Sequence, residues 1–116
     1  MHVRTRLILT GCLAIMDLMA VSTFWQHHIS ATIAVGIISI ILFSLWASWT
    51  HALLFIVAAI CGPLTESVAI HFGAWQYAYP FGTLPIPLWL PLLWGDAAIL
   101  IIAMKHGVEY LKGEIE

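Results

Sequence analysis

Three acidic residues lie within long apolar stretches of this chain, where a carboxylate has little water to solvate it. They are Asp17, Glu66 and Asp96, half of the six acidic residues in the sequence. On insertion scales, a carboxylate at the centre of a membrane helix costs about 2.5–3.5 kcal/mol. Because no Lys or Arg lies in the same stretches, each acid must be protonated, paired with a histidine, bound to a cation or open to water.

Four apolar segments account for most of the chain, and each is near the roughly 20 residues that cross a hydrocarbon core. They are continuously apolar rather than alternating, which favours helices over strands. With 62% hydrophobic and 9% charged residues, the chain has too few polar side chains to cover a water-exposed surface. The sequence therefore predicts an all-α fold, a four-helix transmembrane bundle in one integral membrane domain (residues 1–116), with helices over Leu7–Trp25, Ile29–Trp46, Ala52–Phe72 and Pro87–Met104.

The connections between these segments differ in kind. The first two, Gln26–His28 and Ala47–His51, are short, so the first three helices are expected to be adjacent antiparallel neighbours. The third, Gly73–Ile86, is rich in proline and aromatic residues. Because the residue before a proline is disfavoured in a helix, this loop is expected to be non-helical, with the last helix starting between Ile86 and Leu92.

All of the positive charge lies near the two ends of the chain, at Arg4, Arg6, Lys105 and Lys112. Under the positive-inside rule, this distribution predicts a cell-membrane protein with both termini in the cytoplasm. A net charge of −2 and the absence of a basic stripe argue against a nucleic-acid partner. The lipid bilayer is the predicted environment.

The three acids fall at one estimated depth. Counting about 1.5 Å per residue from the outer ends of their helices, Asp17 lies about 12 Å deep, Glu66 about 9 Å and Asp96 about 13 Å. One interpretation is a single polar pocket inside the bundle, open toward the outer face. The alternative is three separate protonated acids, each bonded to a nearby carbonyl or hydroxyl group.

The shared-pocket interpretation assigns roles to side chains near this layer. Glu66 is the first candidate acid, and Asp96 or Asp17 would stabilise developing positive charge. Aromatic rings can add cation–π stabilisation. The predicted ligand-binding residues are His71, Ser67, Trp75, Trp94 and Tyr77. No Cys/His spacing suggests a metal site, and the sequence identifies no cofactor.

The segment from Glu66 to Asp96 also carries a family resemblance. Glu66, Gly73-x-Trp75-x-Tyr77, Leu84-Pro85-Ile86-Pro87-Leu88-Trp89 and Asp96 resemble a pattern in small bacterial and archaeal membrane proteins of unassigned function. The segment is also loosely similar to the lycopene cyclase-type domain of carotenoid biosynthesis, which has an acid after Leu-Pro-Ile where this chain has Pro87. The resemblance implies that Glu66 and Asp96 are proton donors near an isoprenoid.

Three functions are consistent with these features. The leading hypothesis is an intramembrane carboxylate site for a lipophilic or cationic ligand, with acid-catalysed isoprenoid chemistry as its enzymatic form. The alternatives are a small proton-coupled carrier and an accessory subunit of a larger membrane complex. Because four short helices bury few interior positions, a homo-oligomer or a larger complex is expected under each hypothesis.

Overall fold

The computed structural model describes residues 1–115, and these residues form four helices and no strand. The helices are α1 (Val3–Phe24), α2 (His28–Leu45), α3 (Trp49–His71) and α4 (Leu90–Leu111). Each is long and apolar enough to cross a membrane. The chain is thus an all-α, multi-pass membrane protein, and the predicted fold class is confirmed.

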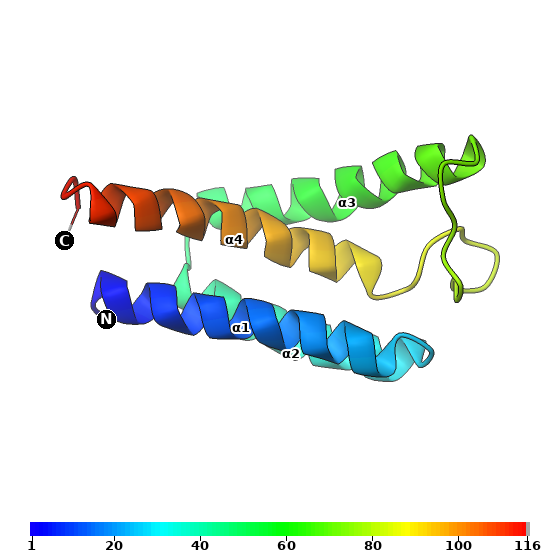
Figure 1. The fold of residues 1–116 in the computed structure, drawn as a ribbon, viewed down its shortest axis with the longest axis horizontal. Helices are drawn as coiled ribbons and strands as arrows, with labels where there is room; N and C mark the ends of the chain where they lie inside the picture. The colour runs from blue at the N-terminus through cyan, green and yellow to red at the C-terminus, as the bar shows by residue number, and fades with distance from the viewer. Residues whose placement is uncertain (116) are drawn as a thin grey trace.

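The helices are arranged around α4, which packs against each of the other three. In Figure 1, α1 and α2 lie together on one side of α4, α3 lies on the other, and both termini are at the same end. The expected neighbours α1 and α2 do pack together, but the expectation that α2 and α3 would do so is wrong. After the short connection at residues 46–48, α3 packs mainly against α4.

Two glycines explain why α3 and α4 pack closely. Gly62 of α3 and Gly95 of α4 are both buried. A Cβ atom added to Gly62 would lie 2.1 Å from the indole of Trp94, and one added to Gly95 would lie 2.5 Å from the ring of Phe55. Each helix thus inserts an aromatic ring onto a glycine of the other, a fit that small residues make possible between membrane helices.

Gly62→Ala is expected to destabilise the fold by about 1–3 kcal/mol, the usual cost of overpacking. The added methyl group would overlap the indole of Trp94, and the gain in helix propensity of about 1 kcal/mol does not offset that clash. Thermal unfolding in detergent micelles measures the effect. Gly11→Ala is the matched control because Gly11 faces open space, so it should be neutral or stabilising. Equal melting temperatures for the two variants would contradict the packing described here.

The segment between α3 and α4 is non-helical from residue 72 to residue 89, and α4 begins at Leu90. Both loop predictions are therefore confirmed. The loop turns through Gly73 and Gly82, whose φ angles of 83° and 57° lie in the left-handed region that glycine adopts without strain. Its last residues fold back onto the bundle, so the loop covers the end opposite the termini (Figure 1).

Two apolar clusters fill the interior. The cluster nearer the termini contains Leu13, Ile38, Leu42, Trp46, Ile99 and Ala103. The cluster nearer the loop contains Ala31, Ile86, Trp89 and Leu90. Between them in the order of α4 lies Asp96, which is buried together with Asp17 and Ser39. The bundle thus encloses a layer of polar side chains between the two apolar clusters.

Candidate functional site

Asp17 of α1 and Asp96 of α4 are neighbours buried inside the bundle. Asp17 is 3% exposed and Asp96 is 0% exposed. Neither oxygen of Asp17 has a hydrogen-bond partner. Of the two oxygens of Asp96, only Oδ1 has one, the hydroxyl group of Ser39. Two neighbouring carboxylate anions in a water-poor interior repel each other, so at least one of the two carries a proton.

Ser39 of α2 completes this polar layer. Its hydroxyl group donates to Oδ1 of Asp96 at 2.6 Å. The carbonyl oxygen of Val35, at 2.9 Å, is a second acceptor within reach of the same hydroxyl. Three helices therefore meet at one group of polar side chains, and we call Asp17, Ser39 and Asp96 the acid-pair site.

Glu66 of α3 lies in a different environment, among aromatic side chains. The hydroxyl group of Tyr77 donates to Oε1 at 2.5 Å, and the indole N–H of Trp94 donates to Oε2 at 2.5 Å. Both oxygens of Glu66 thus act as hydrogen-bond acceptors. We call the adjoining cavity of about 310 Å³ the Glu66 pocket, and it is lined by Glu66, Tyr77, Trp89, Leu90, Leu93, Trp94 and Ala97.

The loop before α4 supplies two of the three aromatic rings of the Glu66 pocket. Tyr77 stands edge-on to Trp89, with ring centroids 6.3 Å apart and ring planes at 89°. Trp89 is 6% exposed, and its indole N–H is buried without a partner. Burial raises the pKa of the Tyr77 phenol, and its hydrogen bond to Glu66 raises it further. Tyr77 therefore keeps its proton at neutral pH and remains a donor to Glu66.

The acid-pair site and the Glu66 pocket lie on different sides of α4. Trp94 and Asp96 are two residues apart, which is about 200° of rotation around a helix. Trp94 packs onto α3 and bonds Glu66, whereas Asp96 meets side chains of α1 and α2. The structure thus divides the single carboxylate pocket expected from depth into two sites, because equal depth says nothing about the side of the helix on which a residue lies.

Of the five predicted ligand-binding side chains, two line a carboxylate site and three do not. Tyr77 and Trp94 line the Glu66 pocket. Ser67 donates instead to a carbonyl group of its own helix at 2.8 Å. His71 is exposed at the end of α3, and Trp75 is 48% exposed in the loop. These last three side chains line neither carboxylate site.

Five residues of these sites were not among the predicted site residues: the apolar residues Leu90, Leu93 and Ala97, and also Trp89 and Ser39. Trp89 immediately precedes α4, and no charged or polar neighbour in the sequence marks it as part of a site. Ser39 is one of four hydroxyl-bearing residues on α2, with Ser30, Thr32 and Ser44, so its residue type alone is a weak signal. The structure assigns Trp89 and Ser39 from contacts with distant residues. Within residues 1–115, no group of three or more His, Cys, Asp or Glu side chains could hold a metal ion.

Comparisons with protein-family models, curated proteins and solved structures gave no match to this chain. The resemblance to the lycopene cyclase-type domain thus stays a prediction. The function of the protein is inferred from the geometry of its two carboxylate sites.

Proposed function

We propose that this membrane protein binds a lipophilic organic cation in the Glu66 pocket. The observation that carries the proposal is the combination of one carboxylate with three aromatic rings around an otherwise apolar cavity. Tyr77 and Trp94 hold both oxygens of Glu66 in place without neutralising its charge. No Lys, Arg or His lines the pocket, so the negative charge is available to a ligand.

The chemistry of the lining selects for a cation with apolar substituents. A cation over an aromatic face gains about 0.5–1 kcal/mol at an exposed site and about 2 kcal/mol when desolvated, and quaternary ammonium groups are characteristic ligands of aromatic cages. Leu90, Leu93 and Ala97 offer apolar contacts to the rest of the ligand. A strongly hydrated inorganic cation would gain little from these walls.

The hydrogen bonds at Glu66 favour ligand binding over acid-catalysed isoprenoid chemistry. A proton donor needs a carboxylic acid O–H directed at the substrate. Both Glu66 oxygens instead accept bonds from neutral donors. Asp96, the second acid implied by the family resemblance, lies on another side of α4 and bonds Ser39.

The acid-pair site favours one second candidate function, a proton-coupled carrier. A carrier of this kind needs a group that holds a proton in the membrane interior. Asp17 and Asp96 must share at least one proton, and apolar clusters separate them from both ends of the bundle. In this form of the proposal, the Glu66 pocket holds the cation and the acid pair holds the proton.

Binding of a quaternary ammonium probe to the purified protein in detergent tests the proposed function. We expect benzyltrimethylammonium to bind at least tenfold more tightly than neopentylbenzene, its uncharged carbon isostere, because a loss of about 1.4 kcal/mol is already tenfold. Equilibrium dialysis measures both affinities. Equal affinities would show that the pocket recognises apolar shape alone and would refute a cation site.

We also propose that both termini are cytoplasmic in the cell membrane, because every Lys and Arg is at the end of the bundle that holds them. A cysteine introduced at Thr83 in the loop is then expected to react with a membrane-impermeant maleimide added to intact cells. A cysteine at Gly113 should react only after the cells are lysed, and both variants need Cys12 and Cys61 replaced by Ala. The reverse labelling pattern would contradict this orientation.

A further inference from the structure

The end of the bundle that holds the termini carries a second cluster of polar side chains, gathered around Trp46. The guanidinium group of Arg6 lies 5.0 Å from the centre of the Trp46 ring. His106 stacks on the same ring with centroids 5.2 Å apart, and His51 lies 6.0 Å away. The indole N–H of Trp46 donates to Thr10 at 2.8 Å, which fixes the ring in the bundle. Helices α1, α3 and α4 thus each bring a basic or titratable side chain to one place.

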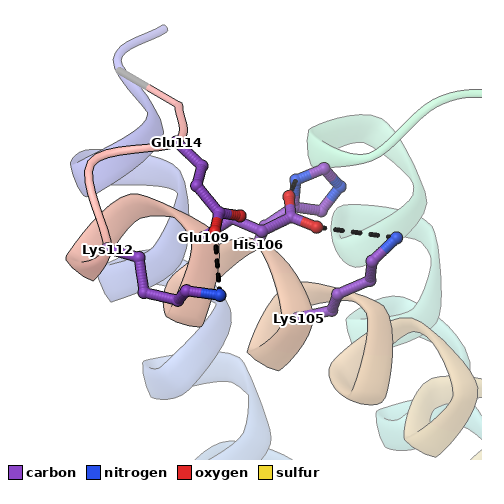
Figure 2. A network of polar contacts seen from close by, with 5 residues as sticks. All are labelled: Lys105, His106, Glu109, Lys112 and Glu114. Atoms are coloured by element: carbon purple, nitrogen blue, oxygen red, sulfur yellow. Dashed lines mark ion pairs between the residues drawn. The ribbon is translucent and has the colours of Figure 1, made fainter.

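The acidic side chains that the structure describes at this end pair with residues other than Arg6, and one of them, Glu109, pairs with His106 of the cluster. Figure 2 shows Glu109 between Lys105, at 3.5 Å, and His106, at 3.7 Å, and Glu114 paired with Lys112 at 2.8 Å. All of these residues lie on α4 or just after it. Within residues 1–115, no carboxylate lies within 4.0 Å of the Arg6 guanidinium. Arg6 therefore keeps a positive charge that no described carboxylate compensates.

His51 adds a hydrogen-bond donor to this cluster. Its Nδ1 pairs with the hydroxyl group of Ser48, which also accepts the backbone N–H of His51. When Ser48 donates its own proton to Nδ1, the ring proton is on Nε2. Nε2 is buried and has no partner. His51 also lies in the first turn of α3, where the helix dipole favours an anion.

An apolar groove has its first α3 lining residue at Ala52, one residue after His51. It has a volume of about 300 Å³, separates α2 from α3, and is lined by Ser39, Ile40, Phe43, Ala52, Phe55 and Ile56. His51 and Phe55 are four residues apart, so they lie on the same face of α3. Ala52, the next residue after His51, is one of the lining residues of the groove. The groove therefore begins within about one helical turn of His51.

We propose that Arg6 and His51 bind the phosphate group of an anionic phospholipid, with one acyl chain in the groove between α2 and α3. A guanidinium group presents paired N–H donors that match phosphate oxygens. A lipid is the occupant that fits because the charge of Arg6 and an apolar groove that begins next to His51 in the sequence lie in a protein whose helices cross a membrane. This site is separate from the Glu66 pocket, which lies nearer the loop.

Titration of the detergent-purified protein with dioleoyl phosphatidylglycerol, followed by native mass spectrometry, tests the proposal. We expect Arg6→Gln and His51→Phe each to weaken binding about tenfold, because hydrogen bonds to charged groups are worth that much. His51→Phe keeps an aromatic ring beside Trp46, so it tests the donor rather than the packing. Arg4→Gln is the control for charge because Arg4 is exposed and outside the cluster; less than a twofold change is expected. Equal losses for Arg4→Gln and Arg6→Gln would overturn the site in favour of general attraction to an anionic surface.

Two further arms identify the source of the phosphate. Glycerol phosphate, which has no acyl chain, is expected to bind at least tenfold more weakly than the lipid. Ala52→Leu, which narrows the groove without changing charge, should weaken lipid binding but not glycerol phosphate binding. If glycerol phosphate binds as tightly as the lipid, or if Ala52→Leu has no effect on the lipid, the acyl-chain groove is refuted and the cluster binds a soluble phosphate.

Discussion

Glu66→Gln should lower the affinity for benzyltrimethylammonium by at least tenfold and leave the fold intact. The substitution keeps the shape of the side chain and removes its charge. Two unit charges about 4 Å apart attract by about 4 kcal/mol at an effective dielectric constant of about 20. Because Glu66 is only partly buried, solvent screens part of this attraction, yet one third of it already gives a tenfold change. Affinity for the uncharged neopentylbenzene should hardly change, because the apolar walls remain.

Asp96→Asn provides the matched control for this experiment. It neutralises an acid at a similar estimated depth, but on the side of α4 that faces α1 and α2. We expect less than a twofold change in benzyltrimethylammonium affinity, measured by equilibrium dialysis, with far-ultraviolet circular dichroism confirming the helical fold of each variant. If Asp96→Asn weakened binding as much as Glu66→Gln, the two acids would have to act on one ligand, and the separation into two sites would be wrong.

The helices could be predicted from apolar length, but their ends could not. The last predicted helix ended at Met104, whereas α4 continues to Leu111. Hydropathy detects the part of a helix that crosses the bilayer, and α4 extends beyond it with the Lys105–Glu109 pair on its surface. Similarly, α3 starts at Trp49 rather than Ala52 because Ser48 caps it. Capping depends on individual side chains that an apolar window averages away.

The sequence could predict how deep each acid lies in the membrane, but not which side of its helix bundle the acid faces. Residue counts placed the three acids in one layer, because the rise of a helix is constant. The side of the bundle that each acid faces depends on how neighbouring helices pack. Here Gly62 and Gly95 bring α3 onto α4, which directs Glu66 to Trp94. A glycine in an apolar helix indicates that something can approach closely, but one sequence does not say which helix does so.

The loop was the region in which local chemistry was most informative. Proline restricts the residue before it whatever the surroundings, so the non-helical segment and the start of α4 followed from the sequence. The contact between Tyr77 and Glu66 did not, because these residues are eleven positions apart and meet only after the loop folds back. Distant pairs of this kind depend on the complete fold.

A double-substitution experiment on the acid pair is expected to be strongly non-additive. Asp17→Leu or Asp96→Leu alone should lower the free energy of unfolding by about 1–3 kcal/mol, because each leaves a buried carboxyl group without its partner. Leucine has the same branching as aspartate, so the packing is largely retained. The double variant should lie within about 1 kcal/mol of the wild type or above it, because replacing both polar partners by apolar groups removes the unsatisfied group. Ser39 would still bond the carbonyl oxygen of Val35.

Unfolding in mixed micelles of dodecyl maltoside and sodium dodecyl sulfate measures the four free energies of this cycle. The interaction energy between Asp17 and Asp96 should exceed about 1 kcal/mol, whereas residues without shared partners usually add to within about 0.3–0.5 kcal/mol. Asp17→Leu combined with Glu66→Gln is the matched control, because Glu66 bonds Tyr77 and Trp94 and shares no partner with Asp17. Additive effects for Asp17 and Asp96 would show that their carboxyl groups do not touch. The interaction energy between Asp17 and Glu66 could instead be as large as that between Asp17 and Asp96. That result would support a single pocket that contains all three acids.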